Sequence, residues 1–407
     1  MSGIAKRVTR LSDGRELIYF DDADTALPPE RKADERPPMP RPPVPELRLD
    51  PLTGEWISIA TARQNRAFLP PDDLDPLAPS APGRPTEIPD NFDVAVFENK
   101  SPSFGPGLPP PGEPAADPTG RRIEVGAARP GYGRCEVVCF GPARTGSWGD
   151  LTESRARTIV EAWADRTEAL SALPGVEQVY VFENRGREIG VTLLHPHGQI
   201  YGYPYITPRT QRLLASIDSY GPELMADILA FEQKSERVLI RGEHFTVFVP
   251  FAARWPIEIH MLPHRHVPDF AATTEAERGE IALLYRRIVR AIDALYDTPT
   301  PYIAAWHQAP ARACRDQVRL MLQVTSPRRA ADKLKYLAGS ETGMGAFIGD
   351  IAPEASAERI RAALAAIPDY PTAPPRRHSP PRPADRRKPA CATPPGRLRG
   401  SNRPRIQ

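Results

Sequence analysis

The sequence contains no run of about 18 consecutive apolar residues, the length that a helix needs to cross the hydrocarbon core of a membrane. Its first residues, MSGIAKR, also lack the apolar stretch of a secretion signal. Only four cysteines occur in 407 residues, which is too few for a framework of disulfides. These absences predict a cytoplasmic protein with reduced thiols and no membrane partner.

An excess of charge of one sign is missing as well, because 53 basic and 51 acidic residues give a formal net charge of +2. Much of the positive charge lies in a basic C-terminal tail, so the rest of the chain is close to neutral, and we expect no nucleic-acid partner. A P-loop is also absent from the sequence. The glycine-rich residues 339–345 do not contain the lysine and the Ser/Thr ending that bind phosphate in such a loop.

Proline, in contrast, is abundant, with 50 residues concentrated in segments 28–45, 70–90, 106–118 and 371–407. Proline cannot continue a helix and removes a backbone donor from a strand, so these segments favour extended, solvated chain. We therefore predict a Pro-rich N-terminal extension over residues 1–45 and a disordered Pro/Arg-rich tail over residues 369–407.

Between these ends, strand patterns and helix patterns alternate. The expected strands cover residues 47–60 (two strands around a turn), 93–98, 134–140, 178–182, 238–251 (a hairpin), 257–263, 302–306 and 318–325, and the expected helices cover 152–173, 209–238 and 275–296. The second part repeats the first in outline, which predicts an N-terminal half over residues 46–206 and a C-terminal half over residues 207–368. Strand-rich halves separated by long helices indicate the α+β class, with antiparallel sheets flanked by helices.

The motif HPHGQ at residues 195–199 carries the clearest chemistry. In an extended segment His195 and His197 would project to the same face. A neutral imidazole is a good nucleophile near neutral pH, and the amide of Gln199 offers a donor for a phosphoryl oxygen. Gly198 permits a close approach of the backbone to a ligand. A pair of this kind by itself is also typical of metal ligands or of core histidines.

The neighbouring motifs resemble those of the galactose-1-phosphate uridylyltransferase family, over about residues 48–365. The matching segments are DPLTGEW at 50–56, Arg63 and Arg66, FEN at 97–99, FENRG at 182–186, Ile189–Gly190, HPHGQ at 195–199, WP at 255–256, WH at 306–307 and Lys335–Tyr336. Residues 13–22 and 339–345 are similar to the actinobacterial branch of that family.

This resemblance implies two tandem histidine-triad-like halves and an exchange of UMP between UDP-glucose and galactose 1-phosphate through a covalent uridylyl-histidine. It makes His197 the nucleophile, Gln199 a ligand of a phosphoryl oxygen and His195 a support of the nucleophile. The remaining residues that it assigns to the substrate site are Arg63, Arg66, Asn99, Asn184, Gly190, Thr192, Lys335 and Tyr336. It also implies a homodimer in which Lys335 and Arg63 act on the partner's site.

The metal sites of the family are the point where this sequence departs from the pattern. Where the family has a CxxC pair the sequence reads DPLA at 75–78, and the loop histidine corresponds to Arg144, so only His195 remains of the zinc ligands. For the iron site His307 remains, but residues 321–323 read MLQ in place of an HxH, and residues 209–213 offer no acid. We therefore expect neither zinc nor iron, and no other cofactor.

Two other functions are compatible with the sequence. A related nucleotide phosphorylase or adenylyltransferase could use the same His197 on ADP-glucose or another nucleotide, because the side chains that select the base are not identified by the motifs. A catalytically silent nucleotide-binding protein, with the Pro/Arg tail as its working part, would bind nucleotides without exchange.

Overall fold

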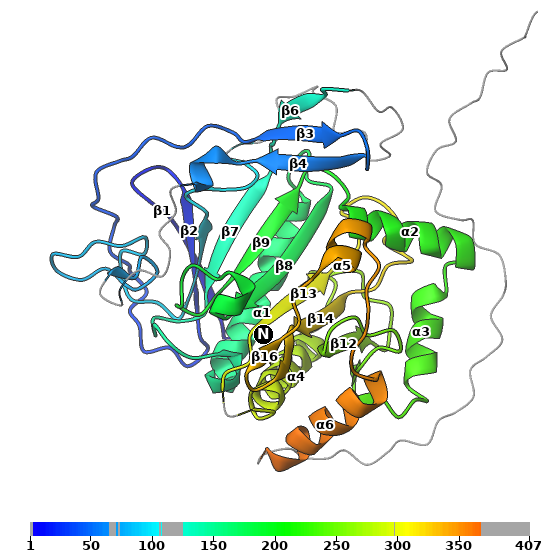
Figure 1. Cartoon of the computed structure of the whole chain (residues 1–407). Helices are drawn as coiled ribbons and strands as arrows, with labels where there is room; N and C mark the ends of the chain where they lie inside the picture. The colour runs from blue at the N-terminus through cyan, green and yellow to red at the C-terminus, as the bar shows by residue number, and fades with distance from the viewer. Residues whose placement is uncertain are drawn as a thin grey trace, which may run out of the picture.

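An eleven-stranded antiparallel sheet forms the centre of the protein, in the strand order β1-β2-β5-β7-β9-β8-β13-β14-β12-β11-β10 (Figure 1). The structure is a computed structural model, and it describes residues 3–367 except 65–70, 72–73, 106, 108–124 and 297. The predicted tail over residues 369–407 lies outside the described residues. The α+β class is confirmed.

The strands of the central sheet are β1 (Ala5–Arg10), β2 (Glu16–Asp21), β5 (Val94–Glu98), β7 (Arg134–Cys139), β8 (Gln178–Arg185), β9 (His197–Tyr203), β10 (Val238–Arg241), β11 (Phe245–Phe248), β12 (Ile257–Pro263), β13 (Tyr302–His307) and β14 (Met321–Ser326). A smaller sheet contains β3 (Glu46–Asp50), β4 (Glu55–Ile59) and β6 (Ala128–Pro130), and β15 (Arg328–Ala330) pairs with β16 (Lys333–Leu334). The α-helices are α1 (Glu153–Ser171), α2 (Pro208–Tyr220), α3 (Leu224–Glu232), α4 (Glu275–Asp293), α5 (Gly339–Met344) and α6 (Pro353–Ala366).

The two strand-rich halves of the chain meet where β8 pairs with β13, with Phe182 opposite Ala305. One continuous sheet therefore spans both halves. The N-terminal extension is part of this sheet, because β1 and β2 form a hairpin and β2 pairs with β5. Residues 17–21 of β2 are buried, so the first residues of the chain contribute to the core.

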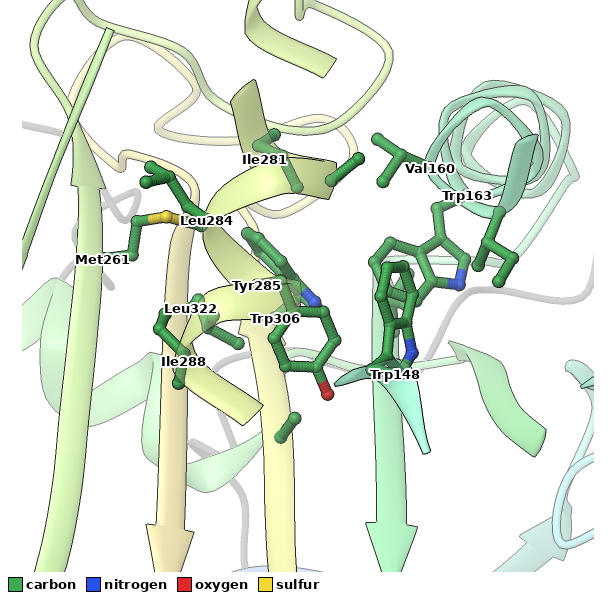
Figure 2. Packing of buried hydrophobic residues seen from close by; sticks show 14 of the residues in the cluster. Trp148, Val160, Trp163, Met261, Ile281, Leu284, Tyr285, Ile288, Trp306 and Leu322 are labelled. Atoms are coloured by element: carbon green, nitrogen blue, oxygen red, sulfur yellow. The ribbon is translucent and has the colours of Figure 1, made fainter. Parts of the chain in front are cut away.

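Helices α1 and α4 cover one face of the sheet and bury the main core. Trp148, Trp163, Tyr285 and Trp306 gather between these helices and the strands (Figure 2). The rings of Trp148 and Tyr285 lie 4.6 Å apart, and those of Trp163 and Trp306 lie 5.9 Å apart. Aromatic residues bury the largest apolar areas, so this cluster fixes both helices to both halves of the sheet.

The ends of these two helices follow the expected capping pattern. Thr152 accepts a hydrogen bond from the amide of Arg155 at the start of α1, within the helix expected over residues 152–173. Thr274 forms a capping box with Glu277 at the start of α4. No helix in the described part of the chain is long and apolar enough to span a membrane.

The prediction of one long helix over residues 209–238 is wrong. This segment is divided into α2 and α3, because Gly221 adopts a φ of 123° and Pro222 follows it. A proline clashes with the preceding helical turn, and glycine tolerates the backbone conformation that ends a helix.

Glu183 on β8 lies in the core and accepts hydrogen bonds from the hydroxyls of Tyr285 (2.5 Å) and Tyr302 (2.9 Å). Burial raises its pKa from 4.5 to about 7, although the two hydroxyls oppose the shift. The folded state therefore keeps this proton over a pH range in which the unfolded chain releases it, and stability falls as pH rises from about 4.5 through 7.

We expect Glu183→Gln to remove this part of the pH dependence, which amounts to about 3 kcal/mol at 1.36 kcal/mol per pKa unit. Urea unfolding of both proteins between pH 4.5 and 8 measures it. The free energy of unfolding of the wild type should fall more steeply with pH than that of the variant, and parallel curves would contradict the expectation.

Candidate active site

A pocket of about 470 Å³ opens on the face of the sheet opposite to α1 and α4, beside β8 and β9. Alternation along β9 places His197 and Gln199 in this pocket, whereas Ile200 points into the core below α1. The polar side chains and glycine of the lining are Arg63, Glu87, Asn99, Lys100, Ser101, Asn184, Gly190, Thr192, His197 and Gln199.

His197 is the first residue of β9, and its side chain is oriented by the backbone. Its Nδ1 lies 2.7 Å from the carbonyl oxygen of His195. A carbonyl oxygen only accepts, so Nδ1 carries the hydrogen and Nε2 carries the lone pair of the neutral ring. This is the tautomer that a histidine nucleophile needs.

Gln199 follows on the same face of β9, and its amide is also oriented. The hydroxyl of Tyr201 donates to its Oε1 at 3.2 Å. The amino end of the amide is then the end that can donate to an anionic oxygen in the pocket.

Gly198, between these two residues, has a different role from the one expected. A Cβ atom there would lie 3.0 Å from the ring of Phe140 and 3.1 Å from the carbonyl oxygen of Phe182. Phe140 belongs to the core below α1, on the side away from the pocket. Packing of the sheet, and not close approach of a ligand, therefore requires glycine.

His195 lies before β9, and it does not project beside His197 as the extended pattern predicted. Its ring is buried, with Nδ1 2.7 Å from Oδ2 of Asp75 and Nε2 2.8 Å from the carbonyl oxygen of Gly141. Burial alone would raise the pKa of Asp75, but the hydrogen bond and charge of His195 outweigh it and hold that pKa below its usual value. Each ring nitrogen is therefore in contact with an oxygen atom, and the ring is fixed at both ends.

The pocket brings together seven of the residues that were predicted from the sequence: Arg63, Asn99, Asn184, Gly190, Thr192, His197 and Gln199. Arg66 lies outside the described residues. Lys335 and Tyr336 lie in the C-terminal half, away from this pocket. The Nζ of Lys335 donates to the carbonyl oxygen of Arg254 at 3.0 Å, and Tyr336 is 76% exposed.

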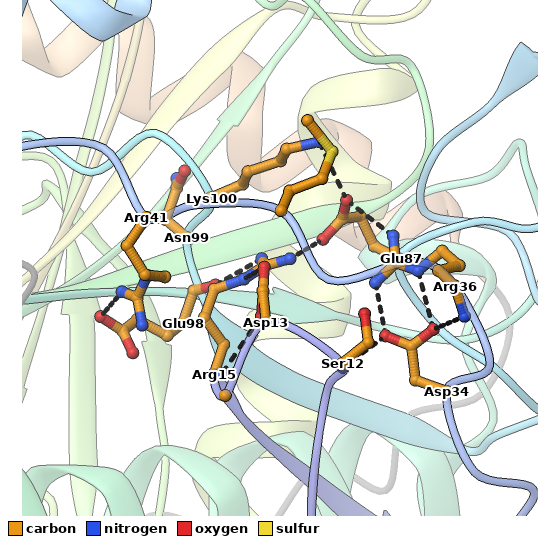
Figure 3. Close-up of polar contacts among 12 residues, drawn as sticks. Ser12, Asp13, Arg15, Asp34, Arg36, Arg41, Glu87, Glu98, Asn99 and Lys100 are labelled. Carbon is orange, nitrogen blue, oxygen red and sulfur yellow. Dashed lines mark hydrogen bonds and ion pairs between the residues drawn. The ribbon is translucent and has the colours of Figure 1, made fainter.

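Sequence reasoning missed Glu87 and Lys100, which belong to an ion-pair network at one wall of the pocket. Figure 3 shows Glu87 between Arg15 and Arg36, with Lys100 nearby. The distances from the carboxylate of Glu87 to the two guanidinium groups are 2.5 and 3.1 Å, and Nζ of Lys100 lies 3.9 Å from it. Lys100 directly follows the FEN motif, and this position was the signal that could have identified it.

The same network connects the N-terminal extension to the pocket. Arg15 donates to the carbonyl oxygen of Glu98 at 2.9 Å, immediately before Asn99, and its Nε donates to Asp13 at 2.7 Å (Figure 3). Buried or half-buried charges of this kind are stable only when paired. The first part of the chain therefore holds the strand end that presents Asn99 and Lys100.

An oriented imidazole beside an uncharged amide donor is suited to attack the phosphorus of a nucleotide and to transfer the nucleotidyl group. The protein is a nucleotidyltransferase. Residues 38–207 match the model of the N-terminal domain of galactose-1-phosphate uridyl transferase, and residues 209–370 match that of its C-terminal domain. The chain belongs to the galactose-1-phosphate uridylyltransferase family.

Individual relatives agree with this assignment. The chain is 41% identical to galactose-1-phosphate uridylyltransferase of Streptomyces lividans, over 88% of this chain and 97% of that protein, and 32% identical to that of Rattus norvegicus, over 77% and 86%. A solved uridylyltransferase structure shares 31% identity and a TM-score of 0.69, covering 79% of this chain and 98% of that one. An ADP-glucose phosphorylase from Arabidopsis thaliana, at 24% identity and a TM-score of 0.57, shares the fold.

The expectation that this chain lacks zinc and iron is wrong, because its galactose-1-phosphate uridylyltransferase homologues are known to bind both metals. The expectation was based only on the metal-ligand positions of the family. A metal that is bound by other residues would not be found in that way. Within the residues that the structure describes, no group of three or more His, Cys, Asp and Glu side chains is placed to hold an ion, and Asp75 and His195 contact each other directly.

Proposed function

We propose that this chain exchanges UMP between UDP-glucose and galactose 1-phosphate, with His197 as the nucleophile. The lone pair on Nε2 attacks the α-phosphorus of UDP-glucose, a nitrogen–phosphorus bond forms, and the bond to the leaving oxygen of glucose 1-phosphate breaks. A phosphate oxygen of galactose 1-phosphate then attacks the same phosphorus, which gives UDP-galactose and returns His197 to its neutral form. Two displacements replace one difficult transfer.

The other pocket residues bind and orient the diphosphate in this proposal. The amide of Gln199 donates to a non-bridging oxygen on which charge accumulates during attack. The guanidinium of Arg63, held by a 2.8 Å hydrogen bond to Oγ of Ser103, neutralises phosphate charge. Asn99, Asn184 and Thr192 supply uncharged polar groups, and Gly190, with a φ of 81°, lets the chain turn beside them.

The single observation that carries the proposal is the 2.7 Å contact between Nδ1 of His197 and the carbonyl oxygen of His195, because it fixes the reactive tautomer. An exchange assay with galactose 1-phosphate tests the function, comparing UDP-glucose with ADP-glucose as donor. We expect turnover of UDP-glucose. Exclusive turnover of ADP-glucose would assign the same chemistry to an adenylyltransferase, and binding of both donors without exchange would make the protein a silent nucleotide binder.

We further infer that the protein acts as a homodimer in the cytoplasm, in the galactose pathway known as the Leloir pathway, with catalytic halves at residues 46–206 and 207–368. Apolar side chains around α5 support the dimer, since Tyr336 is 76%, Met344 83% and Ile348 57% exposed. Exposed apolar groups that gather in one segment are typical of an interaction surface. Lys335 lies in the same segment, but its side chain is buried and its Nζ donates to the carbonyl oxygens of Arg254 and Ile348, so this surface is assigned to Tyr336, Met344 and Ile348.

Met344→Glu is expected to weaken this dimer, because a charge at an apolar contact must be desolvated. Light scattering coupled to size exclusion measures the mass of the wild type and the variant. Val8→Glu serves as the control, since Val8 is 58% exposed on the edge strand β1. A wild-type monomer, or a dimer equally weakened by both substitutions, would contradict the inference.

A further inference from the structure

Residues 3–37, most of the N-terminal extension, lie before the segment that matches the family domain, which starts at residue 38. They nevertheless pack against a wall of the active-site pocket. Leu11, Leu17 and Tyr19 of the extension, all of them buried, form one apolar cluster with Leu77, Ile88, Phe92, Ala95, Phe97, Val137 and Cys139. Three members of this cluster, Leu77, Phe97 and Val137, also line the pocket. The extension therefore contributes to the apolar layer that supports this wall.

Part of the wall is a loop over residues 75–88, which we call the pocket loop. Pro76, Leu77 and Glu87 of this loop line the pocket. The loop closes on itself, because the amide of Glu87 donates to the carbonyl oxygen of Pro76 at 3.0 Å. A displacement of Glu87 would therefore also move the apolar residues at the start of the loop.

Both carboxylate oxygens of Glu87 accept hydrogen bonds from arginines of the extension (Figure 3). Nη2 of Arg15 lies 2.5 Å from Oε2, and Nη1 of Arg36 lies 3.1 Å from Oε1. Arg36 is held in turn by Asp34, which accepts from its Nε and its Nη2 at 2.8 Å each. A guanidinium presents its donors in a rigid planar fork, so these contacts fix the direction of the Glu87 carboxylate as well as pairing its charge.

Arg15 connects the pocket loop to a second element of the pocket. Its Nη1 donates to the carbonyl oxygen of Glu98 at 2.9 Å, and the next two residues, Asn99 and Lys100, line the pocket. Its Nε donates to Asp13 in the turn of the hairpin at 2.7 Å, and its side chain is only 1% exposed. One buried guanidinium thus joins the hairpin, the pocket loop and the end of β5.

We propose that Arg15 is a positioning residue of the transferase site, and that the N-terminal extension thereby determines how tightly the nucleotide donor binds. Arg15 holds the pocket loop and the end of β5 in the arrangement in which both contact the donor, and a site that is arranged before binding loses less entropy when the ligand arrives. His197 is oriented by a different contact, the carbonyl oxygen of His195, so Arg15 acts on donor binding more than on the attack at phosphorus. The inference rests on the proposed function, since UDP-glucose is the donor that we expect in this pocket.

Calorimetric titration of His197→Ala with UDP-glucose measures binding of the donor without its consumption. Addition of Arg15→Met to this protein should weaken binding about tenfold or more, because Glu87 loses a charged hydrogen bond and the two pocket elements lose their connection. Arg15→Lys should recover part of the affinity, since an ammonium group can reach Glu87 or the carbonyl oxygen of Glu98 but cannot form the planar fork.

Arg31→Met, in the same His197→Ala protein, is the matched control, because Arg31 is another buried arginine of the extension, with a side chain that is 5% exposed. Arg31 pairs with Asp21 and lies over the ring of Tyr19, and neither of these residues lines the pocket. We expect Arg31→Met to lower the midpoint of thermal unfolding without a change in donor affinity. Unchanged affinity in Arg15→Met, or an equal loss of affinity in Arg31→Met, would overturn the proposal.

The same titrations with ADP-glucose separate this inference from the proposed function. Binding of ADP-glucose in place of UDP-glucose would contradict the proposed donor, and the loss of affinity for ADP-glucose in Arg15→Met would then decide whether Arg15 positions the site. If Arg15→Met does not fold, Arg36→Met carries the test with an expected loss of several-fold, because Arg36 is less buried, at 19% exposed, and donates to the other oxygen of Glu87.

Discussion

Replacing His197 with alanine is expected to abolish the exchange of UMP and the capture of labelled phosphate on the protein. The variant lacks the Nε2 lone pair that forms the bond to phosphorus, and no other side chain on that face of β9 is a nucleophile of this kind. The loss of activity should be on the order of 10⁴-fold or more, as for other enzymes that lose their nucleophile.

The measurement uses UDP-glucose labelled in the α-phosphate, followed by denaturation under basic conditions and counting of protein-bound label. One label per wild-type chain and none on the variant is the expected result. His244→Ala is a suitable control, because His244 lies in the C-terminal half outside the pocket. Equal labelling of wild type and His197→Ala would show that another residue is the nucleophile.

The elements of this fold were predictable because they depend on local patterns. The short apolar run at residues 178–182 and the capping residue Thr152 identify β8 and the start of α1 without any long-range information. The pairing of β8 with β13 was not predictable in this way, since it joins residues more than 100 positions apart. The break at Gly221 was visible in the sequence, but the apolar pattern on both sides obscured it.

The candidate site also contains some features that a local pattern predicts and others that depend on contacts between distant residues. His197 and Gln199 belong to one short motif, and their alternation predicts a shared face. Asp75 was compared only with a missing metal ligand, although it is the partner of His195 across 120 positions. The role of Gly198 depends on Phe140 and on the backbone of Phe182, so only the packed structure reveals it.

Asp75→Leu is the second substitution with a large expected effect, because Asp75 fixes the residue whose backbone orients the nucleophile. Its carboxylate holds Nδ1 of the fully buried His195 ring, and the carbonyl oxygen of His195 accepts from Nδ1 of His197. Leucine leaves a buried donor without an acceptor, which costs about 1–3 kcal/mol of stability. A displacement of about 1 Å in the nucleophile lowers kcat by about 10²-fold, and KM should change little, since the other pocket residues are untouched.

Asp75→Asn distinguishes positioning from a general loss of stability. The amide oxygen of asparagine can still accept from Nδ1 of His195, so we expect this variant to regain most of the kcat that leucine removes. Asp316→Leu, at an exposed aspartate of the C-terminal half, is the control for the loss of a carboxylate. Steady-state kinetics at a temperature well below the unfolding midpoint of all three variants gives kcat and KM separately. An unchanged kcat in Asp75→Leu, or equal losses in the leucine and asparagine variants, would show that the Asp75–His195 contact does not position His197.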